Sequence, residues 1–315
     1  MSFNSLSTCT LDDNVRGNIR QVIGNFLKRC GLEYVDIAID EAWYSECCQE
    51  AIKRDFPMDG DHSIRAYMDI GVAMMYTYAH LPDRETKMWI CLSTAVLICI
   101  DDIMVRGDDL VHLRRFNERF VNHQPQDDPL MKALDSLLRD VARHYSPPVS
   151  NLMVTSSLNS LSSILLDSET KDMQISKQTP LYPEYCRRLS GMSDLFAFSI
   201  FPSVLPLREY VQCLPYLHIV INHTNDILSY YKEEIDGDTA NYVSLMASSR
   251  GLTKQDVLQE VVETTVQAHH NILEFLRPHT EAYEAYVSFF DGYVKSHAAL
   301  RRYKLAEIMS EGSSS

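Results

Sequence analysis

The sequence predicts an all-α protein with a single domain, and three observations lead to this fold class. The chain has 315 residues, enough for one large domain, and its 45% hydrophobic and 23% charged residues are ordinary for a globular protein. Glycine (11 residues) and proline (12 residues) are scarce, whereas a β-sandwich or barrel needs many turns. The prolines also fall between periodic segments rather than inside them, as helices require.

The segments between the prolines carry apolar residues at helical spacing, and some begin with a residue that can cap a helix. Asp83, Thr253 and Thr280 are the expected N-caps of their segments. We expect residues 1–310 to form the domain and residues 311–315, of sequence Glu-Gly-Ser-Ser-Ser, to be a disordered tail. The expected helices span residues 12–30, 40–54, 63–80, 83–105, 109–122, 129–145, 149–166, 180–200, 214–234, 242–247, 253–276 and 280–303.

The formal net charge of -14 restricts the classes of partner. An acidic surface repels phosphate backbones, so we expect no nucleic acid partner, and an anionic ligand would need metal ions and a local basic cluster. The longest apolar stretch, residues 88–100, is interrupted by Ser93 and Thr94 and stops at Asp101, so no membrane span is predicted. The N-terminus lacks a secretory signal, and the eight cysteines form no CxxC pair. We therefore expect reduced thiols, no zinc site and a cytoplasmic protein.

Two of the expected helices are nearly apolar, and therefore central, yet both end in acidic residues. The segment 83–105 carries Asp101 and Asp102 directly after an apolar run. Carboxylates at a helix C-terminus oppose the helix dipole, and in an apolar setting they are costly unless they are compensated. A bound cation would resolve this conflict. The alternative interpretation is a helix that simply reaches solvent at this point.

The second of these helices, 214–234, carries Asn225, Ser229 and Glu233 at positions i, i+4 and i+8. Each step of four residues drifts only about 40°, so the three side chains share one face. Their amide, hydroxyl and carboxylate oxygens suit Mg²⁺ rather than zinc or copper. Lys232 lies on the same stripe and can reach an anion held by the metal. A surface helix of mixed polarity is the alternative, but a chance match to N-D-x-x-S-x-x-K-E is expected only about once in 10,000 such chains.

This motif and the Asp-rich helix resemble those of the class I terpene cyclases, and most closely the fungal trichodiene synthase-like sesquiterpene synthases. Two further segments are similar to the family. Arg187-Arg188-Leu-Ser-Gly191 resembles its diphosphate-sensing Arg-Arg-x-x-Gly segment, and Arg302-Tyr303 resembles its terminal Arg-Tyr pair. The four elements occur in the family's order and at similar spacing. The resemblance covers about residues 60–308, and the first 60 residues resemble the family only loosely.

The resemblance implies a class I terpenoid synthase fold, which is a helical bundle around a central apolar cavity, and three bound Mg²⁺ ions. Asp101 would bind two of these ions, with support from Asp102. The third ion would be bound by Asn225, Ser229 and Glu233.

The resemblance also implies how the diphosphate is held. Arg187 would sense it, with Arg188 as the rival for that role, while Ser190 and Gly191 would relay a break in their helix. The remaining donors of hydrogen bonds to the diphosphate would be Lys232, Arg302 and Tyr303.

One departure from the family pattern lies in the first acidic motif. The family usually has a third acid there, and this chain has Val105 at that position. Asp108 follows Asp101 by seven residues, so on an unbroken helix it returns to the same side. Because Gly107 is able to break the helix, the sequence leaves the role of Asp108 open.

The chemistry that the resemblance implies explains these residue types. Ionisation of an allylic diphosphate releases diphosphate and leaves a carbocation. Metal ions and Arg or Lys donors stabilise the leaving group, while an apolar, aromatic cavity excludes water and stabilises the cation. Phe196 and Tyr293 rank first as cavity-lining aromatic residues because they lie near Gly191 and Arg302-Tyr303, and ordinary core packing is the alternative.

The resemblance therefore implies a Mg²⁺-dependent lyase that converts farnesyl diphosphate into a cyclic sesquiterpene hydrocarbon or alcohol and diphosphate. The sequence leaves the oligomeric state open, with a homodimer among the candidates because related cyclases are often dimers. Two alternatives stay open. One is a helical binding protein that has kept the fold without activity. The other is a chain-elongating prenyl diphosphate synthase, although that class needs a second Asp-rich motif where this chain has Asn-Asp-x-x-Ser. Cavity shape, which the motifs do not encode, sets the product and decides whether water captures the final cation.

Overall fold

The computed structural model describes residues 11–105, 110–171 and 173–310. These residues form helices joined by turns, with no β-strand among them, so the predicted all-α class is confirmed. In this part of the chain no helix combines the length and the apolar character that crossing a bilayer demands. The α-helices are α1 (Asp13–Arg29), α2 (Glu41–Lys53), α3 (Met68–Thr77), α4 (Arg84–Val105), α5 (Leu110–Val121), α6 (Pro129–His144), α7 (Pro147–Glu169), α8 (Tyr182–Ser190), α9 (Ser193–Ser199), α10 (Leu214–Asp236), α11 (Tyr242–Arg250), α12 (Lys254–Leu276), α13 (Thr280–Ala299) and α14 (Leu305–Ser310).

Four short 3₁₀ turns complete the described secondary structure: η1 (Ile64–Tyr67), η2 (Leu207–Glu209), η3 (Val211–Cys213) and η4 (Arg301–Tyr303). Two of the three predicted N-caps are confirmed. The Asp83 carboxylate accepts the Thr86 N–H at 2.8 Å, and the Thr253 hydroxyl accepts the Asp256 N–H at 3.1 Å. The prediction for Thr280 is wrong, because the carbonyl of His279 already accepts the first helical N–H, which makes Thr280 the first residue of α13.

Two segments predicted as single helices are broken in the structure. The segment 180–200 divides into α8 and α9 at Met192, which adopts a left-handed conformation with φ 48°. The segment 280–303 ends as α13 at Ala299, because Leu300 is extended (φ −95°, ψ 112°), and continues as η4. Lys304, with φ 54°, then turns the chain into α14, which the sequence pattern did not predict. Each break lies beside residues that the sequence predicted to bind diphosphate.

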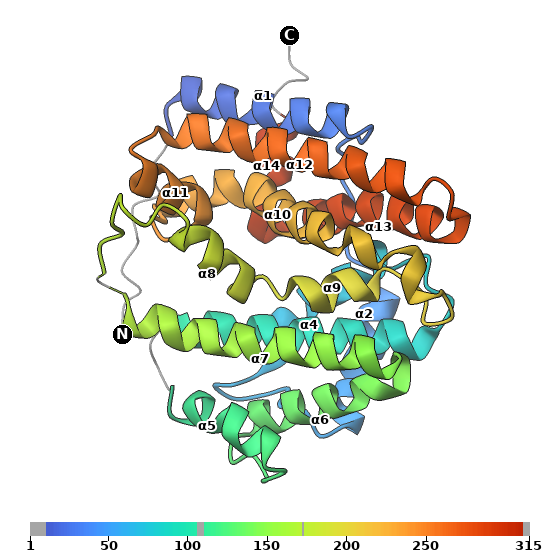
Figure 1. Cartoon of the computed structure of the whole chain (residues 1–315). Helices are drawn as coiled ribbons and strands as arrows, with labels where there is room; N and C mark the ends of the chain where they lie inside the picture. The colour runs from blue at the N-terminus through green and yellow to red at the C-terminus, as the bar shows by residue number, and fades with distance from the viewer. Residues whose placement is uncertain (1–10, 106–109, 172, 311–315) are drawn as a thin grey trace.

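The two central helices are buried as predicted (Figure 1). In α4, residues 89–100 are buried apart from a half-exposed Ile98, and in α10, residues 220–231 are buried apart from a half-exposed Asn225. Helix α10 packs against α12 and α9, while α3 packs against both α4 and α13. The contact of α13 with α3 is so close that a Cβ at Gly292 would overlap the Tyr76 carbonyl oxygen.

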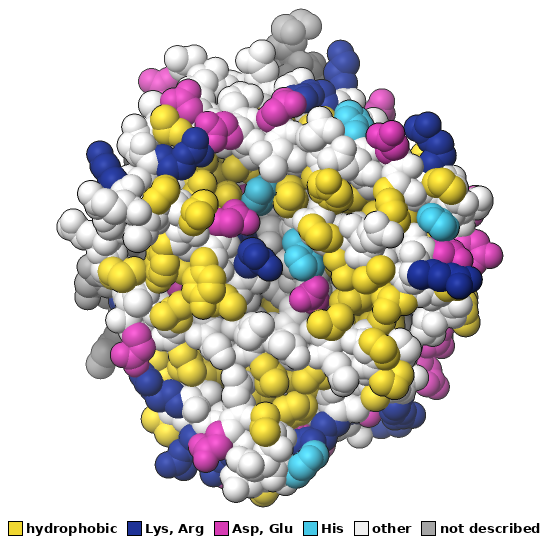
Figure 2. Space-filling view, viewed as in Figure 1, with side chains coloured by type: hydrophobic (Ala, Val, Ile, Leu, Met, Phe, Trp, Pro, Cys, Tyr) yellow, Lys and Arg dark blue, Asp and Glu magenta, His cyan; other side chains and the backbone are white. Residues whose placement is uncertain are grey.

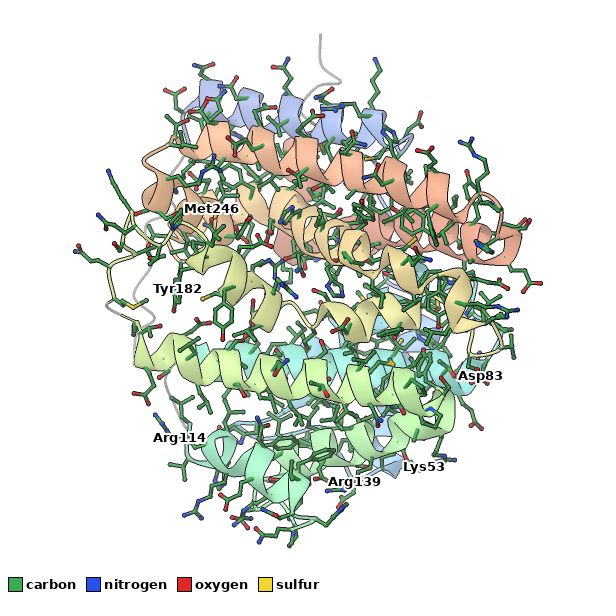
Figure 3. All side chains as sticks on the ribbon, in the orientation of Figure 1. Lys53, Asp83, Arg114, Arg139, Tyr182 and Met246 are labelled. Carbon is green, nitrogen blue, oxygen red and sulfur yellow. The ribbon has the colours of Figure 1, made fainter. Side chains whose placement is uncertain are left out.

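The acidic ends of α4 and α10 lie on the same side of the bundle. Figure 3 shows Asp83, which caps the start of α4, on the side opposite to Tyr182 and Met246. Met246 belongs to α11, which directly follows the end of α10. The end of α4 and the end of α10 therefore point the same way, toward the left of Figure 1.

The described cysteines are not paired with one another in disulfides. All seven described cysteines are free, and six of them are buried. Cys9 and the predicted tail 311–315 lie outside the described residues. The structure therefore adds no disulfide to the forces that hold the described part of the bundle together.

Candidate active site

Asn225 is the most highly connected of the predicted metal ligands. Its Oδ1 accepts a hydrogen bond from Arg187 Nη2 at 3.3 Å, across from α8. Its Nδ2 lies 3.2 Å from the Tyr303 hydroxyl and 3.2 Å from His297 Nε2. Helices α8, α10 and α13 and the turn η4 thus meet at this one amide.

Ser229 and Glu233 continue the same face of α10. The Ser229 hydroxyl donates a hydrogen bond of 2.6 Å to Glu233 Oε1. Burial raises the pKa of Glu233 to about 7, with a further contribution from the Asp226 carboxylate and partial relief from Ser229 and Lys232. Lys232 is half-buried and forms no ion pair with any described residue, so its ammonium group is available to an anionic ligand.

Arg187 joins α8 to α10 through a buried ion pair. Its Nη2 lies 2.9 Å from the Asp226 carboxylate and donates to the Asn222 carbonyl oxygen at 2.9 Å. Burial alone would lower the pKa of Arg187, but the Asp226 carboxylate more than compensates and leaves it above the usual value. Arg187 is therefore charged and is fixed beside Asn225.

The break after α8 depends on the same stretch of α10. Asn222 Oδ1 accepts the Ser193 hydroxyl at 3.0 Å, and a Cβ at Gly191 would overlap that oxygen. Ser190 caps the end of α8 by donating its hydroxyl to the Arg187 carbonyl oxygen at 3.4 Å. The glycine thus permits close approach to α10, while the left-handed backbone lies one residue later, at Met192.

The end of α4 is more open. The Asp101 side chain is solvent-exposed, but the protein around it displaces part of its hydration water, and this is the largest cause that raises its pKa to about 6. The Asp102 and Asp167 carboxylates also contribute to this rise in pKa. Arg302 counteracts this rise, because its guanidinium lies 3.7 Å from the Asp102 carboxylate. The carboxylates at this end are thus only partly neutralised by the protein itself.

The turn η4 connects the two acidic ends. Arg302 reaches Asp102 on α4, and its neighbour Tyr303 reaches Asn225 on α10. Arg187 is close enough to influence the pKa of Asp101 as well. The structure therefore brings residues from α4, α8, α10 and η4, which lie between Asp101 and Tyr303 in the sequence, to one region of the bundle.

The other predicted site residues are placed less centrally. Arg188 is exposed and forms no ion pair with the described residues, unlike its neighbour Arg187. Tyr293 is half-buried, and its hydroxyl donates to the Ile221 carbonyl oxygen at 3.1 Å. Phe196 is half-buried on α9, just after the break. Asp108 lies outside the described residues.

The donor set fits a hard divalent cation. Asn225, Ser229 and Glu233 offer only oxygen ligands, as Mg²⁺ prefers. A second cluster of oxygen donors, Asp101 and Asp102, carries more negative charge than Arg302 compensates. Cations bound at these two places would offset the cost of holding carboxylates at helix C-termini.

Sequence reasoning missed two residues that organise the site. Asp226 was part of the recognised motif but had no assigned role, and the structure gives it the ion pair with Arg187. His297 had no local signal, because its partner Asn225 is 72 positions away. Its ring is buried, and burial lowers its pKa to about 4.

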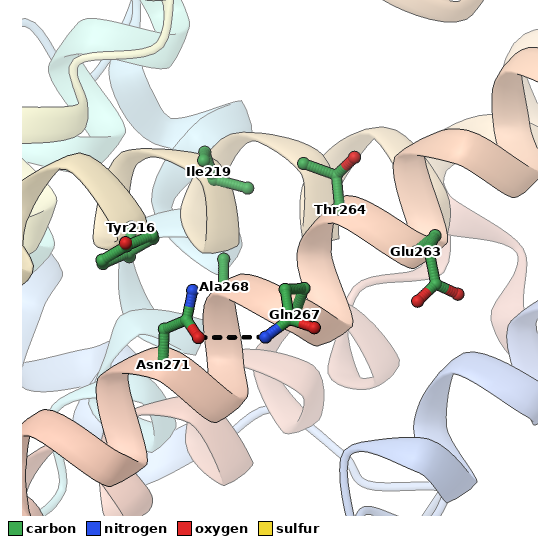
Figure 4. A pocket seen from close by; sticks show the side chains of 7 residues that line it. All are labelled: Tyr216, Ile219, Glu263, Thr264, Gln267, Ala268 and Asn271. Carbon is green, nitrogen blue, oxygen red and sulfur yellow. Dashed lines mark hydrogen bonds between the residues drawn. The ribbon is translucent and has the colours of Figure 1, made fainter.

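Figure 2 shows that this face of the molecule is hollowed near its centre, where basic, acidic and histidine side chains gather. Two grooves lie elsewhere. One of about 370 Å³ runs between α10 and α12 and is drawn in Figure 4, with Tyr216, Ile219 and Ala268 among its lining residues. The other, of about 610 Å³, includes Arg84 and Met88 at the opposite end of α4 from Asp101. Neither groove contains a predicted site residue.

Comparison with known proteins gives a family match over most of the chain. Residues 36–315 match the family Trichodiene synthase (TRI5), so the similarity begins nearer the N-terminus than residue 60, where the sequence motifs placed it. The chain is 32% identical over 297 residues to α-cuprenene synthase COP6 of Coprinopsis cinerea, which covers 93% of this chain and 91% of that protein.

Solved structures with the same fold are more distant in sequence. A linalool/nerolidol synthase from Streptomyces clavuligerus superposes with a TM-score of 0.64 at 13% identity, covering 84% of this chain and 100% of that one. The 2-methylisoborneol synthase of Streptomyces coelicolor A3(2), in complex with Mg²⁺ and 2-fluoroneryl diphosphate, gives a TM-score of 0.58 at 14% identity. The match covers 84% of this chain and 93% of that one. The predicted class I terpenoid synthase fold is therefore confirmed.

Proposed function

The chain belongs to the trichodiene synthase family of terpene synthases, lyases that act on prenyl diphosphates, and we propose that its substrate is farnesyl diphosphate. The product would be a cyclic sesquiterpene hydrocarbon or alcohol, released together with diphosphate. The similarity to an α-cuprenene synthase over nearly the whole chain supports this choice of substrate.

One observation carries the proposal: the turn η4 links the acidic end of α4 to the Asn-Ser-Glu face of α10. Arg302 contacts Asp102, and Tyr303 contacts Asn225. Basic and acidic groups alternate around this region, as binding of a diphosphate together with cations requires.

The residues of this chain divide the work of holding the diphosphate. Arg302 supplies a guanidinium that can bind phosphate oxygens in a bidentate manner, and Arg187 adds a fixed positive charge beside Asn225. Lys232 supplies an ammonium that forms no ion pair with the described residues. The Tyr303 hydroxyl accepts from Asn225 and keeps its own hydrogen for an anion. These donors would stabilise the negative charge that develops as the allylic C–O bond breaks.

We propose three Mg²⁺ ions at this site. Asp101, supported by Asp102, would hold two of them, and the third would be held by Asn225, Ser229 and Glu233. When bound, the ions neutralise the leaving diphosphate as Lewis acids. The solved complex of 2-methylisoborneol synthase, which has the same fold, contains Mg²⁺ and 2-fluoroneryl diphosphate, and it supports the choice of Mg²⁺ as the cation.

The prenyl chain would lie deeper between the helices, where water is excluded. Phe196 and Tyr293 are half-buried on α9 and α13, and each is near a predicted diphosphate-binding segment. Their ring faces would stabilise positive charge on the carbocation. Residues 1–310 would form the catalytic domain, and a homodimer and a cytoplasmic location remain predictions.

The test is to incubate purified protein with farnesyl diphosphate, with and without Mg²⁺, and to analyse the extracted volatiles by mass spectrometry. A cyclic C15 product that requires Mg²⁺ is expected. Geranyl and geranylgeranyl diphosphate are the parallel substrates, and a product from one of these alone would overturn the choice of substrate. A linear C15 product would contradict cyclisation, and no turnover of any of the three would contradict the proposed reaction.

A further inference from the structure

His297 lies at the centre of the site without touching the place where substrate would bind. It is a residue of α13, with only 3% of its surface exposed. Its ring contacts Tyr293 edge-on, with 4.6 Å between ring centroids, and lies 4.5 Å from the ring of Tyr303. Aromatic packing on two sides therefore fixes the plane of the imidazole.

Hydrogen bonds at both ring nitrogens determine which one carries the proton. His297 Nδ1 lies 2.7 Å from the Tyr293 carbonyl oxygen, which can only accept, so Nδ1 donates. In the neutral ring Nε2 is then an acceptor. It lies 3.2 Å from Asn225 Nδ2, which can only donate. The ring and the amide are therefore complementary in this orientation and in no other.

The opposite side of the amide gives an independent indication of the same orientation. Arg187 is a donor at every nitrogen, and its Nη2 lies 3.3 Å from Asn225 Oδ1. An amide rotated by 180° would place Nδ2 against this guanidinium and Oδ1 against the His297 acceptor. Both contacts would then be repulsive, so the two flanking residues select one rotamer of Asn225.

We propose that His297 is a positioning residue that turns Asn225 Oδ1 toward the metal site and its NH₂ group away from it. This inference rests on the proposed function, because it matters only if Asn225 binds Mg²⁺. An amide oxygen has two lone pairs, so Oδ1 can accept from Arg187 and still ligate a cation. The NH₂ group has no lone pair to offer a metal.

His297 would fix the rotamer of Asn225 in the ligand-free protein, before Mg²⁺ and diphosphate bind. Without its acceptor, the NH₂ group of Asn225 keeps the Tyr303 hydroxyl as its one partner among the described residues. A hydroxyl can donate to a rotated amide as readily as it accepts. The amide would then sample both rotamers. Loss of a residue that orients a metal ligand typically weakens metal affinity by about 10- to 100-fold.

A matched pair of variants isolates the acceptor at this position. His297→Gln and His297→Met place side chains of nearly equal length and volume in the same pocket, but only glutamine offers an acceptor oxygen. We expect His297→Met to raise the Mg²⁺ concentration needed for half-maximal binding of inorganic diphosphate by about 10-fold or more. His297→Gln should recover most of this loss. Binding is measured by titration calorimetry, and thermal unfolding of the ligand-free proteins checks that both fold.

A second background keeps the proposal falsifiable if His297→Met fails to fold. In Asn225→Asp, the two side-chain oxygens are equivalent, so orientation by His297 has no remaining purpose. His297→Gln retains only part of the ring's function, so it should still raise the Mg²⁺ concentration needed for diphosphate binding in the wild type. In the Asn225→Asp background, we expect this increase to be smaller by a factor of about two or more.

Different results would contradict the proposed function and the role of His297. Wild-type protein that binds no diphosphate in the presence of Mg²⁺ would contradict the proposed function itself. Wild-type binding with an unaltered Mg²⁺ requirement in folded His297→Met would overturn the role of His297 alone. Equal losses in His297→Met and His297→Gln would likewise overturn it, since they would show that packing rather than the acceptor matters.

Discussion

The acidic ends of α4 and α10 are proposed to bind the same ligand, but their side chains are held in place by different interactions. On α10, Asn225 contacts three other elements, and Ser229 is bonded to Glu233. On α4, Asp101 is exposed, and within the described residues Asp102 alone of the two has an ion-pair partner, Arg302 at 3.7 Å. The α10 half is pre-organised by hydrogen bonds, whereas the α4 half is held by charge and is completed by its ligands.

This contrast has an energetic consequence. Fixed hydrogen bonds remove the reorganisation that ligand binding would otherwise cost. Exposed, crowded carboxylates instead bind cations strongly because binding relieves their repulsion. The site combines the two. The rigid α10 half selects ligands by geometry, whereas the open α4 half attracts cations by its negative charge.

The largest expected effect is the loss of turnover when a proposed metal ligand is removed from either half, and the accompanying change in stability should differ between the halves. Asp101→Ala and Asn225→Ala should each reduce turnover about 10³-fold or more, because each removes a proposed metal ligand. Their effects on stability should differ. Asn225→Ala leaves buried partners unpaired and should lower the free energy of unfolding by about 1–3 kcal/mol. Asp101→Ala relieves repulsion with Asp102 and should leave stability unchanged or higher.

Steady-state kinetics with farnesyl diphosphate, the proposed substrate, and urea unfolding of the ligand-free proteins measure both effects. Asp236→Ala is the control, since this carboxylate is exposed at the end of α10 and has no place in the site. Equal destabilisation by Asp101→Ala and Asn225→Ala would contradict the distinction between the two halves.

The second prediction tests whether Arg187 or Arg188 belongs to the hydrogen-bonded α10 half of the site. Arg187→Lys loses the forked contact with Asp226, Asn222 and Asn225, so we expect kcat/KM to fall about 10²-fold. Arg188→Lys is the matched control, because Arg188 is exposed and the neighbouring position should tolerate the change within about two-fold. Steady-state kinetics of the two variants decides, and the reverse order would transfer the sensor role to Arg188.

The third prediction concerns the contact between α8 and α10. Gly191→Ala would drive a methyl group into Asn222 Oδ1, so we expect a loss of about 1–3 kcal/mol in stability and a smaller loss of turnover. Gly24→Ala on α1 is the control, since nothing lies within 4 Å of a Cβ at that position. It should gain about 0.5–1 kcal/mol. Chemical denaturation compares them, and a neutral Gly191→Ala would show that α8 moves freely.

The smallest expected effect on turnover comes from His269, which lies away from both helix ends. Burial lowers its pKa from 6.5 to about 4, with a further contribution from His270, and its Nδ1 pairs with the Tyr286 hydroxyl at 2.8 Å. Since the unfolded chain binds this proton more tightly, the free energy of unfolding should fall as pH drops from 6.5 to 4, by up to about 3 kcal/mol.

The variant His269→Gln should flatten this part of the pH dependence while turnover at neutral pH stays within about two-fold of the wild type. Urea midpoints measured between pH 7 and pH 4 test the first expectation, and steady-state kinetics tests the second. An unchanged slope in the variant would mean that other groups carry the pH dependence.

The helical architecture and the proposed metal ligands were within reach of sequence reasoning because both depend on local spacing. Periodic apolar residues gave the core helices, and Asn225, Ser229 and Glu233 share a face by helical geometry alone. The two acidic helix ends were recognisable because acidic residues at those positions oppose the helix dipole.

The ion pair of Arg187 with Asp226 and the contact of His297 with Asn225 were beyond sequence reasoning. They join residues 39 and 72 positions apart, and no local pattern encodes such pairs. The break at Leu300 was also missed, because neither glycine nor proline marks it. That break takes Arg302 and Tyr303 off the axis of α13 and turns them toward α4 and α10.

The sequence by itself therefore determined which groups are present and which helix face carries them, since helical period and residue chemistry are local properties. Only the tertiary structure decided how those groups are oriented and charged. Hydrogen-bond partners, burial and charge neighbours come from segments that meet through packing, and they set the rotamer of Asn225, the placement of Arg187 and the raised pKa of Asp101.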